Sequence, residues 1–373
     1  MAAPIKIAVI GCGRVADHYV KILKSGVVSE FQVVACCDLD GDKANRFAEN
    51  FQAKPFTNLE SMLDATTADL VFVLTPSGLH YEHAKLSLGH GFNTLVEKPI
   101  TLIPEQGREL DRLAQEKSLM YGVVFQNRYN KAVARVRKAL DNDELGDIRI
   151  VSVRVRWCRP QRYYDLAPWR GTFSHDGGAL TNQCIHHVDL LRYLGGEIVR
   201  VNASMRTLGA EIEVEDTVVA TMEYGSGAVG VLEGTTAARP DDFEASLSIV
   251  GSKGLAQIGG IAVNELQIFT PSPGECASHS EDFLGIEGHG AVYGFGHSDM
   301  YRDIAAHFAG KAPYPVSRED CIATLRLLHG FYRSDEAGDW VDVQSPEQSS
   351  RLGRPDDEIS NHYRTPPLEV GGN

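Results

Sequence analysis

The sequence predicts two consecutive domains, a first α/β domain with a parallel sheet and a second α+β domain with an antiparallel sheet. The chain has 373 residues, which is too long for one ordinary hydrophobic core. In its first third, nearly continuous apolar strands alternate with helical segments, which is typical of a parallel sheet covered on both faces. Between residues 198 and 270, strands of period two are separated by glycine-rich turns, which indicates an antiparallel sheet with one covered face.

The first domain, expected at residues 1–126, is a series of strands and helices. Its strands are expected at residues 5–10, 31–40, 68–76, 92–99 and 119–128. Its helices are expected from the glycine turn at 11–16 to about Leu23, at 80–91 and at 104–117. The first strand, IKIAVI, is a short β-branched run, and the helix at 80–91 is closed by glycine.

The second domain, expected at residues 127–340, begins with a helix at about 130–140 and the alternating strand GDIRIVSVRVRW. A late helix is expected to start at Ser317, where SRED resembles a capping box with Asp in place of Glu. The apolar residues that recur at helical spacing in it are Ile322, Leu325 and Leu328. Residues 341–373 are polar and contain proline and glycine, so we expect an extended or partly disordered tail there.

The composition restricts the classes of function. Lys plus Arg total 36 and Asp plus Glu 50, which gives a formal net charge of -14. A chain this acidic does not resemble a nucleic-acid-binding protein, because neutralising phosphates needs surplus cations. No apolar run approaches the ~18–20 residues that span a bilayer. The first apolar run leads directly into a glycine turn, so we expect a first strand there and not a signal peptide.

The seven cysteines are scattered without a CxxC pair. An odd number without that spacing favours reduced thiols over a disulfide framework or a zinc site. We therefore expect a cytoplasmic protein with no metal site and with neither nucleic acid nor membrane as a partner.

The stretch GCGRVA at residues 11–16 fits the dinucleotide-binding pattern G-x-G-x-x-G/A between a strand and a helix. Gly11 allows the tight turn, and Gly13 lets the backbone approach a pyrophosphate that the helix N-terminus attracts. Asp38 ends the next strand, where a carboxylate can bind ribose hydroxyls. The two residues after it are leucine and aspartate, so no Arg or Lys follows to pair with a 2′-phosphate, and the sequence favours NAD over NADP.

Lys98 lies in LVEKPI, at the end of the fourth expected strand. Ligands of open parallel sheets bind beyond the carboxyl ends of the strands, and Pro99 denies Lys98 the helical conformation, so the chain turns at this edge. An ammonium group here can project over a bound nicotinamide, hydrogen-bond a substrate hydroxyl and stabilise negative charge on its oxygen. Taken alone, a Lys-Pro pair is more often a surface lysine.

Several motifs, taken in order, resemble the Gfo/Idh/MocA family of NAD(P)-dependent sugar oxidoreductases, and the resemblance extends to about residue 340. These motifs are the glycine turn, Asp38, TPSGLH (75–80), EKP (97–99) and DGGALTNQCIHHVDLL (176–191). The resemblance implies a Rossmann domain followed by a domain with a large, mostly antiparallel sheet, and oxidation of a secondary alcohol of a sugar or polyol, or the reverse. It also implies that Lys98 is the catalytic lysine, that the Lys-Pro bond is cis, and that His186 is the catalytic histidine.

Asn182 stands where the usual family pattern has an aspartate, four residues before the histidine. An amide can hold a sugar hydroxyl but cannot take a proton, so we expect His186 to be the general base, since its ordinary pKa of about 6.5 suits proton transfer near neutrality. Lys98 stays protonated unless it is desolvated, in which case it is the alternative base. On a helix His187 points elsewhere and is expected to pack, whereas Asp189, three residues after His186, could orient it.

Four arginines lie close together in and after the strand at residues 151–157. They are Arg154, Arg156, Arg159 and Arg162. On a strand Arg154 and Arg156 share one face. The group is either a solvated sheet face or an anion site, since guanidinium suits phosphate and carboxylate. We expect Arg156, Arg162 and Asn182 to hold the substrate.

Two further stretches, QNRYN (126–130) and PWRGT with the later DGG (168–178), resemble the branch of the family that acts on nucleotide-linked amino sugars. That branch includes 3-dehydrogenases of UDP-N-acetylglucosaminuronic acid, used in making bacterial surface polysaccharides. The cofactor residues that the motifs and the resemblance imply are Gly11, Gly13, Arg14, Val15, Asp38, Thr75, Pro76, His80, Glu97, Lys98, Gln126, Trp169 and Arg170. The residues implied near the sugar, besides those above, are Asn127 and Arg128.

The expected reaction is therefore NAD-dependent oxidation of a secondary hydroxyl, at C3 of a nucleotide-linked sugar. Three alternatives remain: a dehydrogenase of inositol, another polyol or a free sugar; a redox-neutral glycosidase that borrows NAD; and a non-catalytic NAD-sensing regulator on the same fold. Retention of both Lys98 and His186 favours an enzyme. The resemblance also implies a homodimer or homotetramer formed through the open face of the second sheet.

Overall fold

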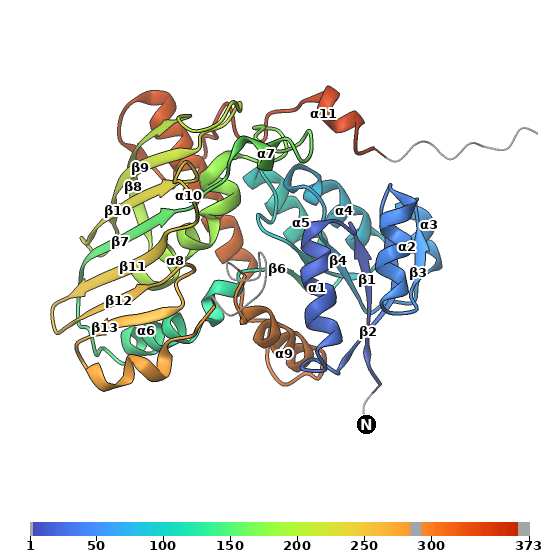
Figure 1. The fold of residues 1–373 in the computed structure, drawn as a ribbon, viewed down its shortest axis with the longest axis horizontal. Helices are drawn as coiled ribbons and strands as arrows, with labels where there is room; N and C mark the ends of the chain where they lie inside the picture. Colours follow the sequence, from blue (N-terminus) through green and yellow to red (C-terminus); the bar gives the residue numbers. More distant parts are fainter. Residues whose placement is uncertain (1–2, 284–292, 365–373) are drawn as a thin grey trace, which may run out of the picture.

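The computed structural model describes residues 3–283 and 293–364. The two expected sheets are present, one in each domain, with helices between them (Figure 1). The prediction of a parallel α/β domain followed by a domain with a larger, mostly antiparallel sheet is confirmed.

The first sheet has six strands, all parallel. In spatial order they are β3 (Lys54–Phe56), β2 (Phe31–Cys37), β1 (Ile5–Ile10), β4 (Leu70–Val73), β5 (Asn93–Val96) and β6 (Tyr121–Val123). This is the order of a doubly wound Rossmann sheet, in which a ligand crevice forms where the order reverses, between β1 and β4. Strand β3 was not expected, because three residues are too few to show a pattern, and its Pro55 is tolerated at the edge of the sheet.

Helices cover both faces of this sheet (Figure 1). They are α1 (Arg14–Lys24), α2 (Gly41–Glu49), α3 (Leu59–Ala65), the short η1 (Ser77–Leu79), α4 (His80–Gly89) and α5 (Pro104–Glu116). Alternate residues of β1 divide between the faces: Val9 packs in one apolar cluster with Tyr19 of α1, and Ile10 in the other with Leu88 of α4. The sheet is thus buried on both sides, as its continuous apolar strands predict.

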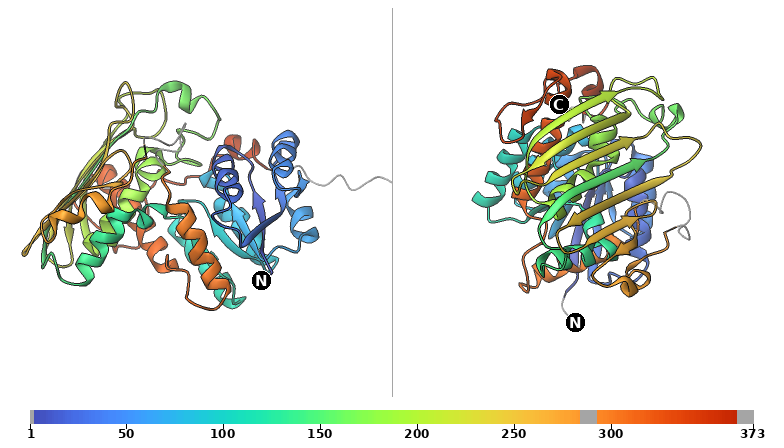
Figure 2. Two further views of the ribbon diagram at one scale, coloured as in Figure 1. Left: turned by 60° about the horizontal axis from the view of Figure 1, so that its bottom comes forward. Right: turned by 90° about the vertical axis from the view of Figure 1, so that its left-hand side faces the viewer.

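The second sheet has eight strands and is antiparallel except for the pair β7 and β10. In spatial order they are β13 (Glu265–Phe269), β12 (Leu255–Gly259), β11 (Glu244–Gly251), β7 (Ile148–Arg156), β10 (Val229–Thr235), β9 (Thr217–Tyr224), β8 (Ile198–Arg206) and β14 (Val341–Asp342). One face of this sheet is open, and the right-hand view of Figure 2 looks onto that face.

The covered face of the second sheet packs against helices that lie between the two sheets (Figure 1). These are α6 (Lys131–Asp141), α8 (Ile185–Gly195) and α10 (Arg318–Ala337). The predicted start of α10 is confirmed, since Ser317 Oγ accepts a hydrogen bond from Asp320 N at 3.0 Å. The remaining short elements are η2 (Gln126–Tyr129), α7 (Gln161–Tyr164), the π-helix η3 (Ala179–Gln183), η4 (Pro273–Glu275), η5 (Ala277–His279) and α11 (Asp357–Asn361).

Helix α9 (Gly296–Phe308) returns from the second half of the chain to the first sheet. The ring of its Tyr301 lies 5.0 Å from that of Phe31 and 5.7 Å from that of Phe72. The chain therefore crosses between the domains more than once, whereas the expected division at residue 126 describes a single crossing.

The polar segment after residue 340 is folded in its described part, which differs from the extended tail that we expected. Strand β14 pairs with β8, and Val343 and Leu352 are buried. Arg351 forms ion pairs with Asp335 and Glu336 near the end of α10. Isolated apolar residues and an arginine that meets two carboxylates are enough to hold this segment, although its composition is that of a loop.

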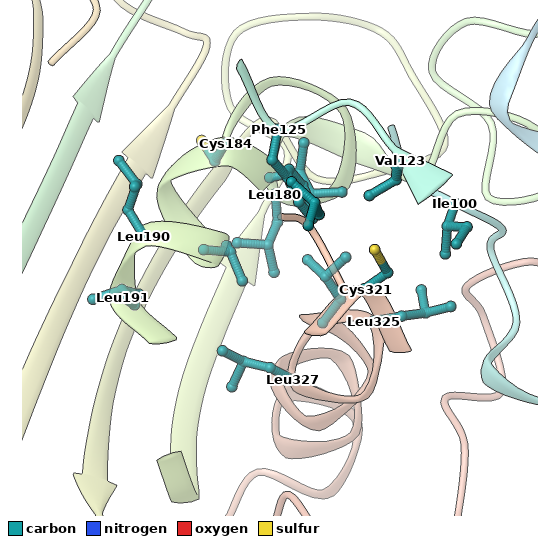
Figure 3. Packing of buried hydrophobic residues seen from close by; sticks show 14 of the residues in the cluster. Ile100, Val123, Phe125, Leu180, Cys184, Leu190, Leu191, Cys321, Leu325 and Leu327 are labelled. Atoms are coloured by element: carbon teal, nitrogen blue, oxygen red, sulfur yellow. The ribbon is translucent and has the colours of Figure 1, made fainter. Parts of the chain in front are cut away.

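A single apolar cluster continues from the first domain into the second (Figure 3). Ile100, Val123 and Phe125 come from the first domain. Leu180, Cys184 and Leu190 come from the segment around the π-helix and α8, and Leu325 comes from α10. This packing fixes the end of β5, which Lys98 follows, against the start of α8, which carries His186. Within the described residues no helix is both long enough and apolar enough to cross a bilayer.

Candidate active site

The glycine turn lies between β1 and α1 and has the shape that a dinucleotide needs. Gly11 has φ +92°, and a Cβ there would lie 2.9 Å from the backbone of Leu74, so only glycine fits. Among the described residues, an added Cβ at Gly13 would meet no atom within 4 Å, and no side chain caps the start of α1. The N–H groups of the first turn, which begins with Arg14 and Val15, thus face open space, which suits a pyrophosphate.

Asp38 is positioned at the end of β2 beside this turn. Its carboxylate accepts hydrogen bonds from Cys12 N at 2.8 Å and from Asp40 N at 3.0 Å. A carboxylate has further acceptor positions, so it can hold the turn and still bind ribose hydroxyls.

The segment after β4 connects the two domains. Gly78 N donates to His175 O at 3.1 Å, and a Cβ on Gly78 would lie 2.5 Å from Ser174 O, so the backbones touch here. His80 is buried, with Nδ1 2.6 Å from Pro99 O and Nε2 2.8 Å from Thr75 O. His80 therefore ties the segment with Thr75 and Pro76 to the turn after Lys98. Burial lowers the pKa of His80 to about 4.

Glu97 and Lys98 follow β5. Glu97 is buried and accepts from Tyr19 OH at 2.8 Å and from Lys98 N at 3.1 Å. The Lys98–Pro99 bond is cis, as the resemblance implies. Lys98 Nζ donates to the backbone oxygen of Asn182 at 2.8 Å and lies 3.4 Å from its Oδ1. Two of the three ammonium hydrogens thus have acceptors, and the third is free for a substrate oxygen.

His186 is buried near the start of α8, and its Nε2 lies 3.2 Å from Gln126 Nε2. Its Nδ1 has no partner among the described residues. Burial first, and then the charge of Lys98, hold the pKa of His186 well below 6.5. The imidazole is therefore neutral near pH 7 and has a lone pair that can accept a proton. The contacts of Lys98 with Asn182, of Gln126 with His186 and of Gly78 with His175 define what we call the domain seam.

Asp189 does not orient His186, which corrects that expectation. It accepts from Arg128 Nε at 2.7 Å and Nη2 at 2.6 Å, and from Thr324 Oγ1 at 3.3 Å. Arg128 also lies 3.1 Å from Asp320 on α10 and is only 7% exposed, so its guanidinium is used in joining η2, α8 and α10. The expectation that Arg128 and its buried neighbour Asn127 lie near the sugar stays a prediction. His187 packs against the ring of Trp157, as expected.

The four arginines Arg154, Arg156, Arg159 and Arg162 do not lie together, because β7 ends at Arg156 and the chain changes direction there. Val151, Val153 and Val155 face the core, so Arg154 and Arg156 lie on the open face of the sheet. There Arg156 pairs with Glu233 at 2.6 Å and with Glu244 at 3.3 Å. The structure does not bring Arg156, which we expected to hold substrate, to the domain seam, because a strand sends alternate residues to opposite faces. Arg162 is exposed on α7.

Arg159 and Arg170 are the arginines directed towards the domain seam. The charges of both lower the pKa of Lys98, although burial contributes more to that shift. Arg170 lies over the rings of Tyr163 at 4.4 Å and Trp169 at 4.5 Å and donates to Tyr163 OH at 2.5 Å. The sequence analysis did not identify Tyr163 as the residue that contacts both Arg159 and Arg170. Its only signal in the sequence was its position beside the arginines.

Asp176 is the other residue that sequence reasoning missed. It is buried, and it accepts hydrogen bonds from Gly171 N at 2.7 Å and from the side chain of Asn182. Its signal was present in the DGG of the motif that begins at residue 176. No group of three or more His, Cys, Asp or Glu that could hold a metal ion occurs in the described part of the chain.

Comparisons with known proteins agree with this geometry. The family model described as "Oxidoreductase family, NAD-binding Rossmann fold" matches residues 5–125, and that described as "GFO/IDH/MocA C-terminal domain" matches residues 133–257. The WlbA dehydrogenase of Chromobacterium violaceum, solved with NADH and UDP-GlcNAcA, is 34% identical, with 91% of this chain and 96% of that chain covered and a TM-score of 0.84. This chain belongs to the Gfo/Idh/MocA family. It is an oxidoreductase with an NAD-binding domain, and both predictions are confirmed.

Further relatives are similar over between 59% and 92% of the chain. The WlbA dehydrogenase of Bordetella pertussis, also solved with NADH and UDP-GlcNAcA, is 32% identical, with coverage of 91% and 98% and a TM-score of 0.85. The D-glucoside 3-dehydrogenase of Escherichia coli strain K12 is 26% identical over 365 residues, 92% of this chain and 98% of that protein. The scyllo-inositol 2-dehydrogenase (NADP(+)) IolW of Bacillus subtilis strain 168 is 28% identical over 221 residues, 59% of this chain and 60% of that protein.

The two glycines of the turn should respond differently to substitution. Gly13→Val should weaken NAD binding by about tenfold or more, because the added atoms occupy the space where the pyrophosphate approaches. It should leave the melting temperature of the NAD-free protein nearly unchanged, because its Cβ meets no protein atom. Gly11→Ala should lower both affinity and melting temperature. Calorimetric titration with NAD and thermal unfolding measure the two effects, and equal melting losses would contradict this account.

Proposed function

We propose that this oxidoreductase removes hydrogen from a secondary hydroxyl, at C3 of a nucleotide-linked sugar resembling UDP-N-acetylglucosaminuronic acid, in surface polysaccharide synthesis. The observation that carries the proposal is the contact of Lys98 with Asn182, which leaves one ammonium hydrogen available to a substrate near the neutral His186. The two groups come from different domains, so the substrate would bind at the domain seam.

The two side chains divide the chemistry. His186, which is neutral because it is buried, accepts the proton of the hydroxyl on the ring nitrogen that carries no hydrogen. Lys98 donates a hydrogen bond to the same oxygen and stabilises the negative charge that develops there. Bound NAD supplies the acceptor for the hydride that leaves the carbon. The exclusion of water by the packed cluster on both sides of the domain seam strengthens each of these interactions.

The basic residues of the domain seam support an acidic substrate. The chain has a net charge of -14, yet the positive charges of Arg159 and Arg170 lie close enough to Lys98 to lower its pKa. Arg159 is held by Asp242 at 2.7 Å and by the rings of Trp157 and Tyr163, and a positioned guanidinium suits a carboxylate or a phosphate. Both WlbA structures, which contain UDP-GlcNAcA, support the same class.

The second candidate is oxidation of a free glucoside or an inositol, as the names of the E. coli and B. subtilis relatives indicate for those proteins. A free polyol carries no charge, so it gives Arg170, which has no ion pair among the described residues, no anionic partner. A non-catalytic NAD sensor is not favoured, because it needs neither the ammonium of Lys98 nor the neutral imidazole of His186 at the domain seam.

Activity on matched substrates tests the proposal. We expect UDP-N-acetylglucosaminuronic acid with NAD to be turned over at least about tenfold more efficiently than UDP-N-acetylglucosamine, which lacks the carboxylate, and than inositol or glucosides. Lys98→Ala and His186→Ala should each lower kcat by about 10²–10⁴-fold while NAD still binds. The absorbance of reduced nicotinamide measures turnover. Activity on free polyols alone would eliminate the nucleotide sugar, and full activity of either variant would remove that residue from the scheme.

The pH dependence of kcat/KM should be bell-shaped. Its acid and alkaline midpoints should lie below the ordinary pKa values of histidine and lysine. His186 must be unprotonated and its pKa lies below 6.5, so the rate should fall on the acid side at a midpoint below 6.5. Lys98 must be protonated and its pKa lies below 10.5, so the rate should fall on the alkaline side at a midpoint below 10.5. Lys98→Ala should lose the alkaline limb. An acid midpoint above 6.5 would assign the base to another group.

We also infer that two copies pair through the open face of the second sheet, and that the protein works in the cytoplasm with its seven free cysteines reduced. The open face carries the exposed apolar residues Ile150, Val219, Val229, Val231, Val250 and Ile268. In register, Val229 lies beside Ile150, and Glu233 lies between Val219 and Arg154. An apolar face with internally paired charges is suited to a second copy of itself.

Light scattering tests the pairing. The protein should have at least twice the monomer mass, and Val231→Asp should reduce it to the monomer, because it places an unpaired carboxylate in the apolar patch. Leu208→Asp, at a residue that is 71% exposed outside the strands, should leave the mass unchanged. A monomeric protein, or a multimer that survives Val231→Asp and other charges on this face, would contradict the inferred interface.

A further inference from the structure

Lys98 contacts an amide at the position where the usual pattern of the family has a carboxylate. Asn182 offers the ammonium two acceptors, its backbone oxygen at 2.8 Å and its Oδ1 at 3.4 Å. An amide carries no charge, so Asn182 cannot offset the cost of burying the lysine. A buried cation needs a negative partner nearby.

Asp176, from the far side of Asn182, adds its negative charge to that of Glu97. It is 1% exposed, one of its oxygens accepts from the side-chain nitrogen of Asn182, and the other accepts from Gly171 N at 2.7 Å. Asp176 precedes the π-helix η3 that carries Asn182, and the extra residue of a π turn is often found at functional sites.

The donors and acceptors of this chain determine which way the amide points. An ionised carboxylate only accepts, so the NH₂ group of Asn182 must face Asp176. The amide oxygen then faces the other way, towards Lys98, where it accepts from the ammonium. If the amide turned over, its NH₂ would face an ammonium, which has no acceptor to offer.

We propose that Asp176 is a positioning residue for Lys98: its carboxylate fixes the amide of Asn182, and the two together hold the ammonium in place of the missing aspartate at position 182. The predicted effect of Asp176 on turnover rests on the proposed function. Its predicted effect on the pKa of Lys98 does not. Asp176 does not touch the substrate in this scheme, so it acts through Asn182.

The charges around Lys98 support this assignment. Glu97 and Asp176 favour its protonated form, whereas burial, Arg170 and Arg159 oppose it. The other titratable groups that face it are His80, His186 and Cys184. Glu97 comes from the lysine's own strand end, so Asp176 is the negative group that the second domain contributes. Burial raises the pKa of Asp176 itself, and the hydrogen bonds from Gly171 and Asn182 oppose that rise.

A purely structural role for Asp176 is the competing explanation. Through Gly171 it also anchors the loop after Trp169 and Arg170, so its removal could act by loosening that loop. Exchanging the two side chains separates the explanations. In Asp176→Asn alone, the new amide accepts from Gly171 N and donates to Asn182, which then turns its NH₂ towards Lys98. In the double variant Asp176→Asn with Asn182→Asp, every donor again meets an acceptor, and a carboxylate contacts Lys98 directly.

The test measures Lys98 without using the sugar substrate. Trace acetic anhydride labels the unprotonated amine, and mass spectrometry of the Lys98 peptide over a pH series gives its pKa in the NAD-bound protein. We expect Asp176→Asn to lower that pKa by about one unit or more and to lower kcat by about tenfold or more, with little change in NAD affinity. The exchanged double variant should return the pKa to the original value or above it, and recover most of kcat.

Each result decides between the explanations. An unchanged Lys98 pKa in Asp176→Asn overturns the inference. A lowered pKa that the exchanged variant does not restore, together with a lower melting temperature in both, assigns Asp176 the structural role. If Asp176→Asn does not fold, Asn182→Ala replaces it, because that variant keeps the Gly171 contact and should still lower kcat. If no sugar is turned over by the unchanged protein, the proposed function fails, while the labelling still tests Asp176.

Discussion

The structure depends on one constraint, which is that the ammonium of Lys98 is held in the interior at the meeting point of two domains. Its acceptors come from Asn182 in the second domain, and its opposing charges come from Glu97 in the first domain and Asp176 in the second. A cation removed from water in this way needs hydrogen-bond acceptors and opposing charges close by. The domain seam must therefore be closely packed, and it can only be assembled when both sheets are in place.

Several features of the fold follow from that constraint. The apolar cluster that contains Phe125 and Leu180 continues across the domain seam, Gly78 allows the backbones to touch, and α9 packs its Tyr301 against the first sheet. These contacts leave few ways for one domain to turn relative to the other. His186 consequently keeps its place beside Gln126 without a charged partner of its own, and it stays neutral because it is buried.

The sequence predicts what is periodic or local, and it does not predict partners. Both sheets, the glycine turn and the end of β5 at Lys98 follow from patterns that run along the chain. Asp189 is three residues from His186, yet it pairs with Arg128, because the choice depends on which helix crosses α8. Arg156 and Arg159 are also three residues apart, and they point to opposite sides because β7 ends between them. Asp176 was visible in its motif, but only the π turn after it shows that it faces Asn182.

The most direct test of the central claim is a crystal structure of the ternary complex with NAD and the sugar that is turned over. This account predicts that Lys98 Nζ and one ring nitrogen of His186 both lie within about 3.2 Å of the same hydroxyl oxygen. It also predicts that the carbon bearing that hydroxyl faces the nicotinamide. A complex in which either nitrogen is turned away from that oxygen, or in which the sugar lies outside the domain seam, would contradict it.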